Sequence, residues 1–432
     1  MNEFLMGMSK EDITPELGCL LYGYPRERRA QRVIDPLSVG AVALNQGDET
    51  VLLFGVDICA VNLDICTYIR EEISKATGVK TANIMYSCIH THSGPVTRNS
   101  VGWGTADMDY INGTLIPKSI KAAKDALSSM VPALMAVGKV MSELGMNRRQ
   151  IKDGEVILGQ NPDLPYDPNM TVVTFKSLDG KNLGSIAHYA AHPTVAGSNL
   201  SITRDWPAQM IDKLEEVTGA PSMYINGAEG NLGPRLSNGR TTADESYLAE
   251  IGEWAARDAL KALEDATDFK APTLKIHAEW IKFPYTSLPP IEEVEAEIES
   301  LGDPKDHVAT QITRYAQLCK MRDILNSDSK MPEALDVLHT VIALDDFAMV
   351  PFPFEAFCEI ALEIRERSPY KETILLGLTG GSYGYLPTLE QIPYGGYEIL
   401  SFHAASIPRF IDDLGGHLVN ESVRLLNKLY KM

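Results

Sequence analysis

Short apolar runs alternate along this chain with segments whose apolar residues recur at helical spacing, and this interleaving limits the possible folds more than any other feature. Residues 38–60 hold two apolar runs separated by Asn45 to Asp48, as in a strand hairpin with a short turn. Isoleucines at four-residue intervals predict a helix over 62–77, and residues 83–89 predict a buried strand. Further strand-like runs lie at 170–176, 183–190, 338–350 and 373–379, and a second amphipathic helix at 109–128. The pattern predicts an α/β fold with mixed β-sheets flanked by helices.

The composition is that of a soluble globular protein. The 432 residues correspond to one large domain or to roughly three domains of about 150 residues each. A net charge of −19 would repel nucleic acid and anionic lipid surfaces, and no apolar run approaches the roughly 18 residues of a membrane span. The N-terminal residues lack the basic and apolar regions of an export signal, and the six cysteines form no CxxC pair. We therefore expect a cytoplasmic protein with reduced cysteines, a small-molecule substrate, no nucleic acid and no stable membrane association.

Residues 288–327 differ from the rest of the chain. They open with prolines, are dense in charge, and repeat apolar positions at helical spacing. The pattern predicts a helical hairpin broken at Gly302 to Pro304 and inserted into the α/β domain. Such an insertion is typical of a lid, an arm or an oligomer contact, so a homo-oligomer is one state compatible with the sequence.

The sharpest local motif is His90-Thr91-His92, directly after a predicted strand. On an extended backbone, residues two apart point to the same side, so both imidazoles are expected to face one pocket. Neutral imidazole is a common metal ligand, and catalytic zinc usually takes three protein ligands plus water. The motif by itself leaves two interpretations open, a metal site or two histidines that bond to backbone and solvent.

A second histidine pair and a glycine-rich loop follow two later strands. His192 stands before a proline at a strand end and can line a site, whereas His188 is expected to be a core histidine. Residues 226–235 bring backbone N–H groups close to a ligand and could stabilise an oxyanion, but their spacing matches neither a P-loop nor a dinucleotide fingerprint. A tight structural loop is the alternative.

Taken together, short blocks in a fixed order resemble the neutral/alkaline (non-lysosomal) ceramidase family, specifically its N-terminal catalytic domain. The resemblance runs over almost the whole chain. It implies a single ceramidase-like domain over residues 1–432, without the C-terminal β-sandwich domain of secreted ceramidases. The blocks are Asp12-Ile13-Thr14-Pro15, Gly23-Tyr24, the strand ending at Asp57, His90 to Pro95, Asn147-Arg148, Asn161-Pro162, His192-Pro193-Thr194, Asp205, residues 226–235, Pro353-Phe354-Glu355 and Tyr385-Leu386-Pro387-Thr388.

The resemblance implies a catalytic zinc ion held by His90, His192, Glu355 and Tyr385. Two imidazoles and a carboxylate form a common catalytic zinc set, and a phenol is a rarer ligand. Without the resemblance, Glu355 would be interpreted as an acid at a helix N-terminus and Tyr385 as a packed aromatic residue.

The resemblance also implies roles for residues around the metal. His92 is expected to assist substrate binding or proton transfer. Arg148 is expected to hold a substrate oxygen, although Arg149 follows it and could point inward instead. Asp205 either orients a ligand histidine or makes a structural salt bridge. The backbone at Gly230, Asn231 and Gly233 is expected to contact substrate or oxyanion.

One departure from the family pattern bears on the substrate. Ceramide-cleaving members carry a pattern like Gly-Asp-x-Ser-Pro in the loop, where this chain has Asn231 for the aspartate and Gly233 for the serine. A serine-centred mechanism is therefore not available at this loop. The sequence predicts a zinc-dependent hydrolase in which a zinc-bound water attacks the amide of a small polar N-acyl compound. A zinc esterase, lactonase or sugar- or polyol-processing enzyme, and a non-catalytic binding protein, are the alternatives.

Overall fold

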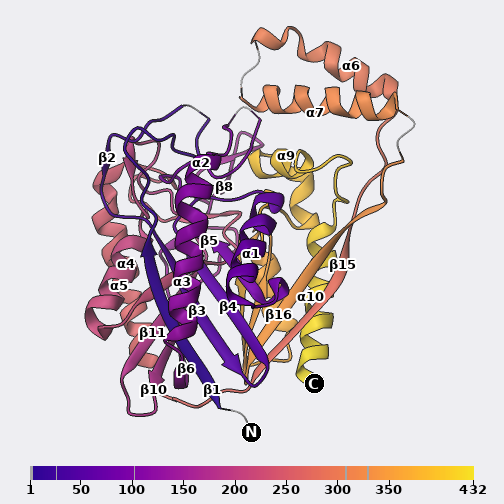
Figure 1. Cartoon of the computed structure of the whole chain (residues 1–432). Helices are drawn as coiled ribbons and strands as arrows, with labels where there is room; N and C mark the ends of the chain where they lie inside the picture. The colour runs from indigo at the N-terminus through magenta and orange to yellow at the C-terminus, as the bar shows by residue number, and fades with distance from the viewer. Residues whose placement is uncertain (1–2, 26, 102, 307–308, 328–329) are drawn as a thin grey trace.

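The computed structural model describes residues 3–25, 27–101, 103–306, 309–327 and 330–432. Its largest element is an eight-stranded mixed sheet that runs through the middle of the molecule (Figure 1). The strands are, in spatial order, β13 (Ser222–Asn226), β11 (Asn182–Tyr189), β10 (Asn169–Ser177), β6 (Val131–Met141), β1 (Phe4–Asp12), β3 (Ser38–Gln46), β4 (Glu49–Val56) and β5 (Ile84–Cys88).

A four-stranded sheet packs against one face of the large sheet. Its spatial order is β15 (Leu274–Pro284), β16 (Ala334–Leu344), β17 (Phe347–Pro351) and β19 (Glu372–Leu376). One apolar cluster contains side chains from both sheets, among them Phe4, Leu44 and Phe175 from the large sheet and Ile342 and Met349 from the small one. Burial of this cluster from water holds the two sheets together.

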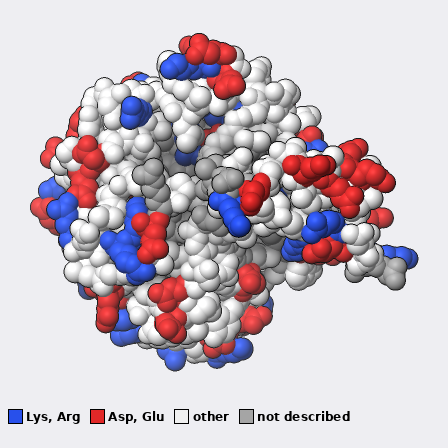
Figure 2. Space-filling view, turned by 90° about the horizontal axis from the view of Figure 1, so that it is seen from above, with Lys and Arg blue, Asp and Glu red and all other residues white. Residues whose placement is uncertain are grey.

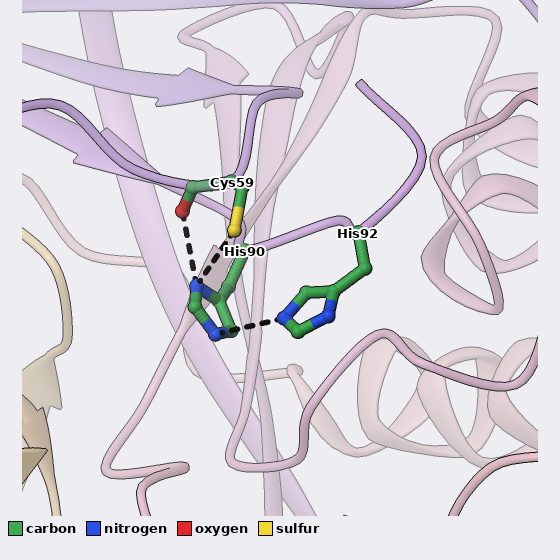
Figure 3. Close-up of side chains that lie close together, drawn as sticks. All are labelled: Cys59, His90 and His92. Atoms are coloured by element: carbon green, nitrogen blue, oxygen red, sulfur yellow. Dashed lines mark hydrogen bonds between the residues drawn. The ribbon is translucent and has the colours of Figure 1, made fainter. Parts of the chain in front are cut away.

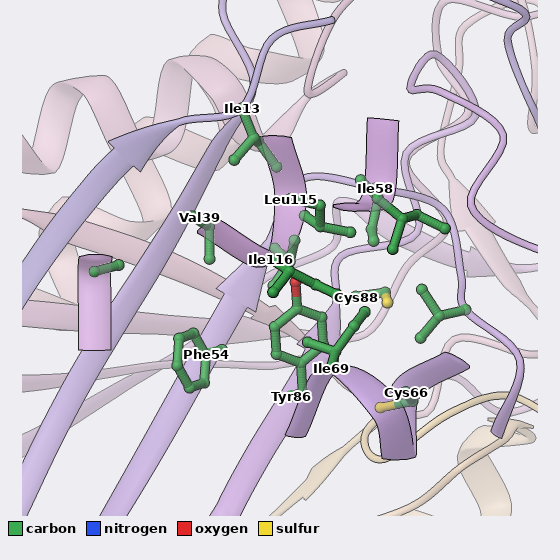
Figure 4. Close-up of a cluster of buried hydrophobic side chains, with 14 of the residues drawn as sticks. Ile13, Val39, Phe54, Ile58, Cys66, Ile69, Tyr86, Cys88, Leu115 and Ile116 are labelled. Carbon is green, nitrogen blue, oxygen red and sulfur yellow. The ribbon is translucent and has the colours of Figure 1, made fainter. Parts of the chain in front are cut away.

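Helices cover the two outer faces, so the molecule has four layers. The outer face of the large sheet is covered by α1 (Leu63–Thr77), α3 (Ile116–Ser128), α4 (Pro207–Thr218) and α5 (Leu248–Asp265). The small sheet is covered by α8 (Cys358–Arg367) and α10 (Leu414–Lys431). Figure 4 shows how Ile69 of α1 and Ile116 of α3 lie beside Phe54 and Tyr86 of the large sheet.

Strand alternation explains why the large sheet is buried on both faces. In β3, Val39 and Ala41 belong to the core under α1 and α3, whereas Val42 and Leu44 belong to the core between the sheets. Successive side chains point to opposite faces, and here both sets are apolar, as expected of a strand covered on both sides.

Two helices project from the four-layered body in the region where the sequence predicts a helical hairpin (Figure 1). They are α6 (Ile291–Leu301) and α7 (Ala309–Leu325); residues 307–308 between them lie outside the described part of the chain. Val294 packs against Leu318 and Met321 to hold the pair together. Acidic side chains gather on this projection at the right of Figure 2, and α6 alone contributes Glu292, Glu293, Glu295, Glu297 and Glu299.

The remaining elements are short or peripheral. The helices are α2 (Met108–Tyr110) and α9 (Tyr397–His403), and the short strands are β2 (Arg32–Val33), β7 (Gly145–Asn147), β8 (Arg149–Lys152), β9 (Glu155–Leu158), β12 (Ser201–Ile202), β14 (Leu232–Pro234), β18 (Glu355–Ala356) and β20 (Tyr385–Leu386). Within the described ranges, none of the helices combines the length and apolarity that crossing a membrane requires.

The mixed α/β fold predicted from the sequence is confirmed. β3 and β4 form the predicted hairpin, with Gly47 at a positive φ of 63° in the turn. One predicted run is divided differently: residues 338–350 do not form a single strand, because Asp345, with φ of 51°, turns the chain between β16 and β17.

Close helix-on-sheet packing generates a stability prediction. A Cβ atom at Gly138 of β6 would lie 1.9 Å from the carbonyl oxygen of Ala262 in α5, whereas one at Gly113 meets nothing within 4 Å. We expect Gly138→Ala to lower the free energy of unfolding by roughly 1–3 kcal/mol, because the helix must move away from the sheet. The control Gly113→Ala should leave stability unchanged or raise it. Equal midpoints for the two variants in denaturant unfolding would contradict this packing.

Candidate metal centre

The carboxyl ends of two parallel strand pairs meet at one end of the molecule. β4 pairs in parallel with β5, and β11 pairs in parallel with β13. The amide of Asn226, the last residue of β13, donates to the carbonyl of Ile89 at 3.0 Å and to that of Ala191 at 3.3 Å. These two residues directly precede His90 and His192, so one buried amide ties together the two chain segments that carry the histidines.

Glu355 and Tyr385 come from a separate short strand pair. β18 and β20 are parallel, and Glu355 and Tyr385 are direct neighbours in their register. The glycine-rich loop fixes this pair from the other side, because the Gly230 N–H donates to the carbonyl of Ala356 at 2.8 Å. A Cβ atom at Gly230 would lie 2.2 Å from the carbonyl oxygen of Glu355, so only glycine allows this approach.

His90, His192 and Glu355 form a compact buried group of metal-ligating type. The Nε2 atom of His90 lies 3.3 Å from Oε2 of Glu355, and that of His192 lies 3.4 Å from the same oxygen. Figure 3 shows that Nδ1 of His90 faces the carbonyl of Cys59, at 3.0 Å. Nδ1 of His192 faces the carbonyls of Glu229 and Leu232 at 2.8 and 2.9 Å.

These contacts fix the tautomers of both imidazoles. A carbonyl only accepts hydrogen bonds, so each Nδ1 carries a proton, and each ring in its neutral form directs the lone pair of Nε2 toward Glu355. Oε2 of Glu355 has no hydrogen-bond donor among the described residues. Three acceptors that face one another in a buried site repel unless a proton or a metal cation lies between them, and a divalent metal ion fits this donor set. The residues present therefore fit the zinc ion implied by the resemblance.

The pKa shifts of the two histidines also indicate that this group favours a bound cation. Burial lowers the pKa of His192 to about 3, with the Arg148 charge acting in the same direction. Burial also opposes the charge of His90, but Cys59 and Glu355 outweigh it and raise the pKa of His90 well above its usual value. In the absence of a metal ion, a proton on His90 thus partly neutralises the carboxylate, and a metal ion that binds there displaces it.

His92 reaches the group by a route that differs from the predicted one. Strand β5 ends at Cys88, and His90 has a left-handed backbone with φ of 75°. The two histidines therefore do not converge through strand alternation; a turn at His90 brings Nε2 of His92 to 3.2 Å from Nε2 of His90 (Figure 3). A Cβ atom at Gly23 would lie 2.4 Å from the His92 ring, so this glycine sets the position of the ring.

Tyr385 and Arg148 lie beside the metal-ligating group. The Tyr385 hydroxyl is 3.5 Å from Nε2 of His192 and accepts a hydrogen bond from Nη2 of Arg148 at 2.8 Å. Nε of Arg148 donates to Glu398, which also accepts from Arg149. Of the two adjacent arginines, Arg148 is thus the one that reaches the site, and Arg149 anchors Glu398 from behind.

The glycine-rich loop supports the site through its backbone, and of the three residues predicted to contact an oxyanion, Gly230 has its N–H already occupied. The Gly230 N–H is already bonded to Ala356, which removes it as an oxyanion donor. Asn231 accepts from the N–H of Cys358 and donates to Glu359, so its side chain caps α8. Gly233 lies in β14, where a Cβ would meet the Thr241 side chain at 2.5 Å.

Asp205 and His188 also have structural partners. The Asp205 carboxylate accepts from the backbone N–H groups of Val195, Ala196 and Trp206, so it orders the segment after His192, and among the described residues it binds neither an imidazole nor a basic side chain. His188 is buried, with Nε2 at 2.8 Å from the carbonyl oxygen of Leu375, and burial lowers its pKa to about 4. Its interpretation as a core histidine agrees with this environment.

Sequence reasoning did not single out three residues near the group. Cys59 fixes the His90 tautomer through its carbonyl, and Arg98 lies close enough to Glu355 for charge interaction. Both carboxylate oxygens of Glu229 are buried without a hydrogen-bond partner among the described residues, and burial raises its pKa to about 8. None of the three belongs to a spacing pattern that predicts a site. Only Glu229 stands in a sequence context that could have indicated one, because it is an acid inside a glycine-rich loop that follows a strand.

Comparison with known proteins identifies the fold. No protein-family model and no curated protein matches the sequence. The crystal structure of neutral ceramidase from Pseudomonas aeruginosa is similar, with a TM-score of 0.76 and 16% identity, covering 100% of this chain and 75% of that one. A ceramidase complexed with C2 gives a TM-score of 0.77 and 17% identity, covering 100% and 76%. The chain therefore has the neutral ceramidase fold, as the sequence resemblance predicts.

The metal content of the purified protein tests the candidate metal centre. We expect the purified protein to contain stoichiometric zinc and His90→Ala to lose it, because two protein ligands do not hold zinc as three do. The matched control His188→Gln replaces a buried histidine outside the group and should retain the metal. Elemental analysis of the three proteins, with circular dichroism to verify folding, gives the answer. Equal zinc in the parent and in His90→Ala would remove His90 from the site.

Proposed function

We propose that this protein is a zinc-dependent hydrolase that cleaves the amide bond of a small polar N-acyl compound. The observation that carries the proposal is the buried group of His90, His192 and Glu355 with the Arg148–Tyr385 pair at its edge. A zinc ion bound there supplies Lewis acidity and lowers the pKa of a water molecule. The neutral ceramidase fold, whose solved examples are named for an amide-cleaving activity, supports the same reaction class.

The chain supplies donors for the oxygen of the scissile carbonyl. The guanidinium of Arg148 is buried, and its charge interactions with Tyr385 and Glu398 outweigh burial and raise its pKa, so it is always cationic. Its Nη2 and the Tyr385 hydroxyl lie together beside the metal-ligating group and can stabilise negative charge that develops on that oxygen. Tyr385 alternatively completes the ligand set from the position it already occupies.

His92 is placed to accept a proton. Burial and the neighbouring His90 and His192 lower its pKa well below its usual value, so the ring is neutral at neutral pH. Its Nδ1 is buried and has no partner among the described residues. A neutral imidazole beside the reacting atoms can accept a proton from water, and its lowered pKa makes the protonated ring a stronger acid that passes the proton to the leaving nitrogen.

The substrate class follows from the charge balance and the loop. With a net charge of −19, approach to an anionic lipid surface is unfavourable, and Gly233 provides no nucleophilic side chain. We therefore favour a small polar amide over ceramide as substrate, in the cytoplasmic setting that the sequence suggests.

Turnover on matched amide, ester and glycoside panels tests the function. We expect amide hydrolysis that is lost on dialysis against a chelator and restored by zinc. Glu355→Gln should be inactive both after chelator treatment and after zinc is added back, because the substitution removes the anionic ligand while it preserves side-chain size. Faster turnover of esters or lactones would move the protein to another hydrolase class, and zinc-independent thermal stability with no turnover would indicate a non-catalytic protein.

The contact between Gly23 and His92 gives a more selective prediction. Gly23→Ala places a methyl group against the His92 ring and should displace it, lowering kcat by roughly 10²-fold or more because general acid–base catalysis contributes about that much. Zinc content should remain that of the parent, since the three ligands do not touch Gly23. Gly18→Ala is the control, because it also lies at positive φ but has no neighbour within 4 Å. Unchanged kcat in Gly23→Ala would exclude His92 from proton transfer.

A further inference from the structure

Arg98 is a cationic side chain near the metal centre that the mechanism above does not use. Among the described residues, its guanidinium makes one hydrogen bond, from Nη1 to the Ser382 hydroxyl at 3.1 Å, and its Nε is buried without a partner. No carboxylate of the described chain lies within ion-pair distance of it. A guanidinium has five N–H donors, so most of the donor capacity of Arg98 remains unused.

Hydrogen bonds connect Arg98 to the strand pair that carries Glu355. The Ser382 hydroxyl that binds Arg98 also accepts from the N–H of Gly384, and the Gly384 carbonyl accepts from the N–H of Glu355. On the other side, the Thr97 hydroxyl donates to the carbonyl of Ala60, next to Cys59. The guanidinium is therefore bound to the segment that positions Glu355, and the residue before Arg98 is bound next to the segment that positions His90.

Arg98 and several side chains near the centre are more exposed than the metal-ligating residues. Glu355 and the ligand histidines are buried, whereas Arg98, His92, Tyr24 and Tyr397 are half-buried. Burial disfavours the charge of Arg98, but Tyr22 and Glu355 outweigh it and raise its pKa, so it stays cationic. Arg98 is thus a fixed positive charge with free donors that is more accessible to solvent than the metal-ligating group.

The local charge balance is opposite to that of the whole chain. Arg28, Arg98 and Arg148 lie around the centre and Arg149 lies behind Glu398, against the carboxylates of Glu355, Glu398, Glu229 and Asp205. Burial raises the pKa of Glu229 to about 8, so at neutral pH the arginines outnumber the ionised acids, and a bound zinc ion would add two more positive charges. In a protein of net charge −19, such a concentration of cations favours an anionic ligand at this one place.

From these observations we propose that Arg98 binds a carboxylate on the substrate, so that the enzyme acts on N-acyl amino acids or similar amides that carry a carboxylate close to the scissile bond. This inference rests on the proposed function. Arginine suits the role because its planar fork binds a carboxylate through two parallel hydrogen bonds. Arg98 is then a specificity residue and not itself a zinc ligand.

Matched substrates and an inert ligand test the proposal on the zinc-loaded protein. We expect kcat/KM for N-acetyl amino acids to exceed that for their carboxamides at least tenfold, Arg98→Gln to remove this preference and Arg98→Lys to keep part of it. The control Arg257→Gln, at an exposed arginine of α5, should behave as the parent. Calorimetric binding of an N-methylsulfonyl amino acid, whose sulfonamide is not cleaved, should be at least tenfold tighter than that of its carboxamide, and this difference should vanish in Arg98→Gln.

The two readouts separate this inference from the proposed function. If no amide is cleaved but binding still discriminates through Arg98, the proposed function is wrong and the carboxylate site stands. If amides are cleaved with equal kcat/KM for carboxylate and carboxamide, or if a neutral N-acyl amino alcohol is cleaved faster, the carboxylate site is overturned and the hydrolase stands. A preference that persists unchanged in Arg98→Gln also overturns it.

Discussion

The arrangement of the site depends on three backbone carbonyls that hold two imidazole protons. Because the carbonyls of Cys59, Glu229 and Leu232 accept from the Nδ1 atoms of His90 and His192, both Nε2 lone pairs are directed at one oxygen of Glu355. Lone pairs and a carboxylate at this separation in a buried site repel one another, so the folded chain maintains an arrangement that a cation stabilises. The left-handed backbone of His90 is part of the same constraint, since strain of this kind persists only where surrounding contacts over-determine it.

The fold supplies those contacts from distant parts of the chain. The four-layered core fixes the parallel strands, and Asn226 joins the ends of the segments that precede the two histidines. The glycine-rich loop then approaches the Glu355 backbone so closely that Gly230 cannot carry a side chain. A loop that resembles an oxyanion hole in sequence thus contributes rigidity, and its Gly230 N–H is used within the protein.

The sequence predicted the mixed α/β architecture because long apolar strands such as β3 and β10, and amphipathic helices such as α1, carry strong periodic signals. His90 and His192 were visible as histidines at strand ends. Glu355 and Tyr385 lie on strands of two residues, too short for any periodicity, and only the ceramidase resemblance pointed to them. The sequence could not predict the turn at His90 or the roles of Arg98 and Glu229, because these depend on contacts between segments that are distant in the sequence, 31 residues for His90 and Cys59 and 284 for Arg98 and Ser382.

The central claim is that His90, His192 and Glu355 surround one divalent cation. The most direct measurement is an anomalous difference map from a crystal of the purified protein, with data collected on both sides of the zinc absorption edge. The account predicts one strong peak about 2.0–2.2 Å from both Nε2 atoms and from a Glu355 oxygen. A map without a peak between these three side chains, from crystals grown with zinc, or a peak bound instead to Cys59 and His92, would contradict it.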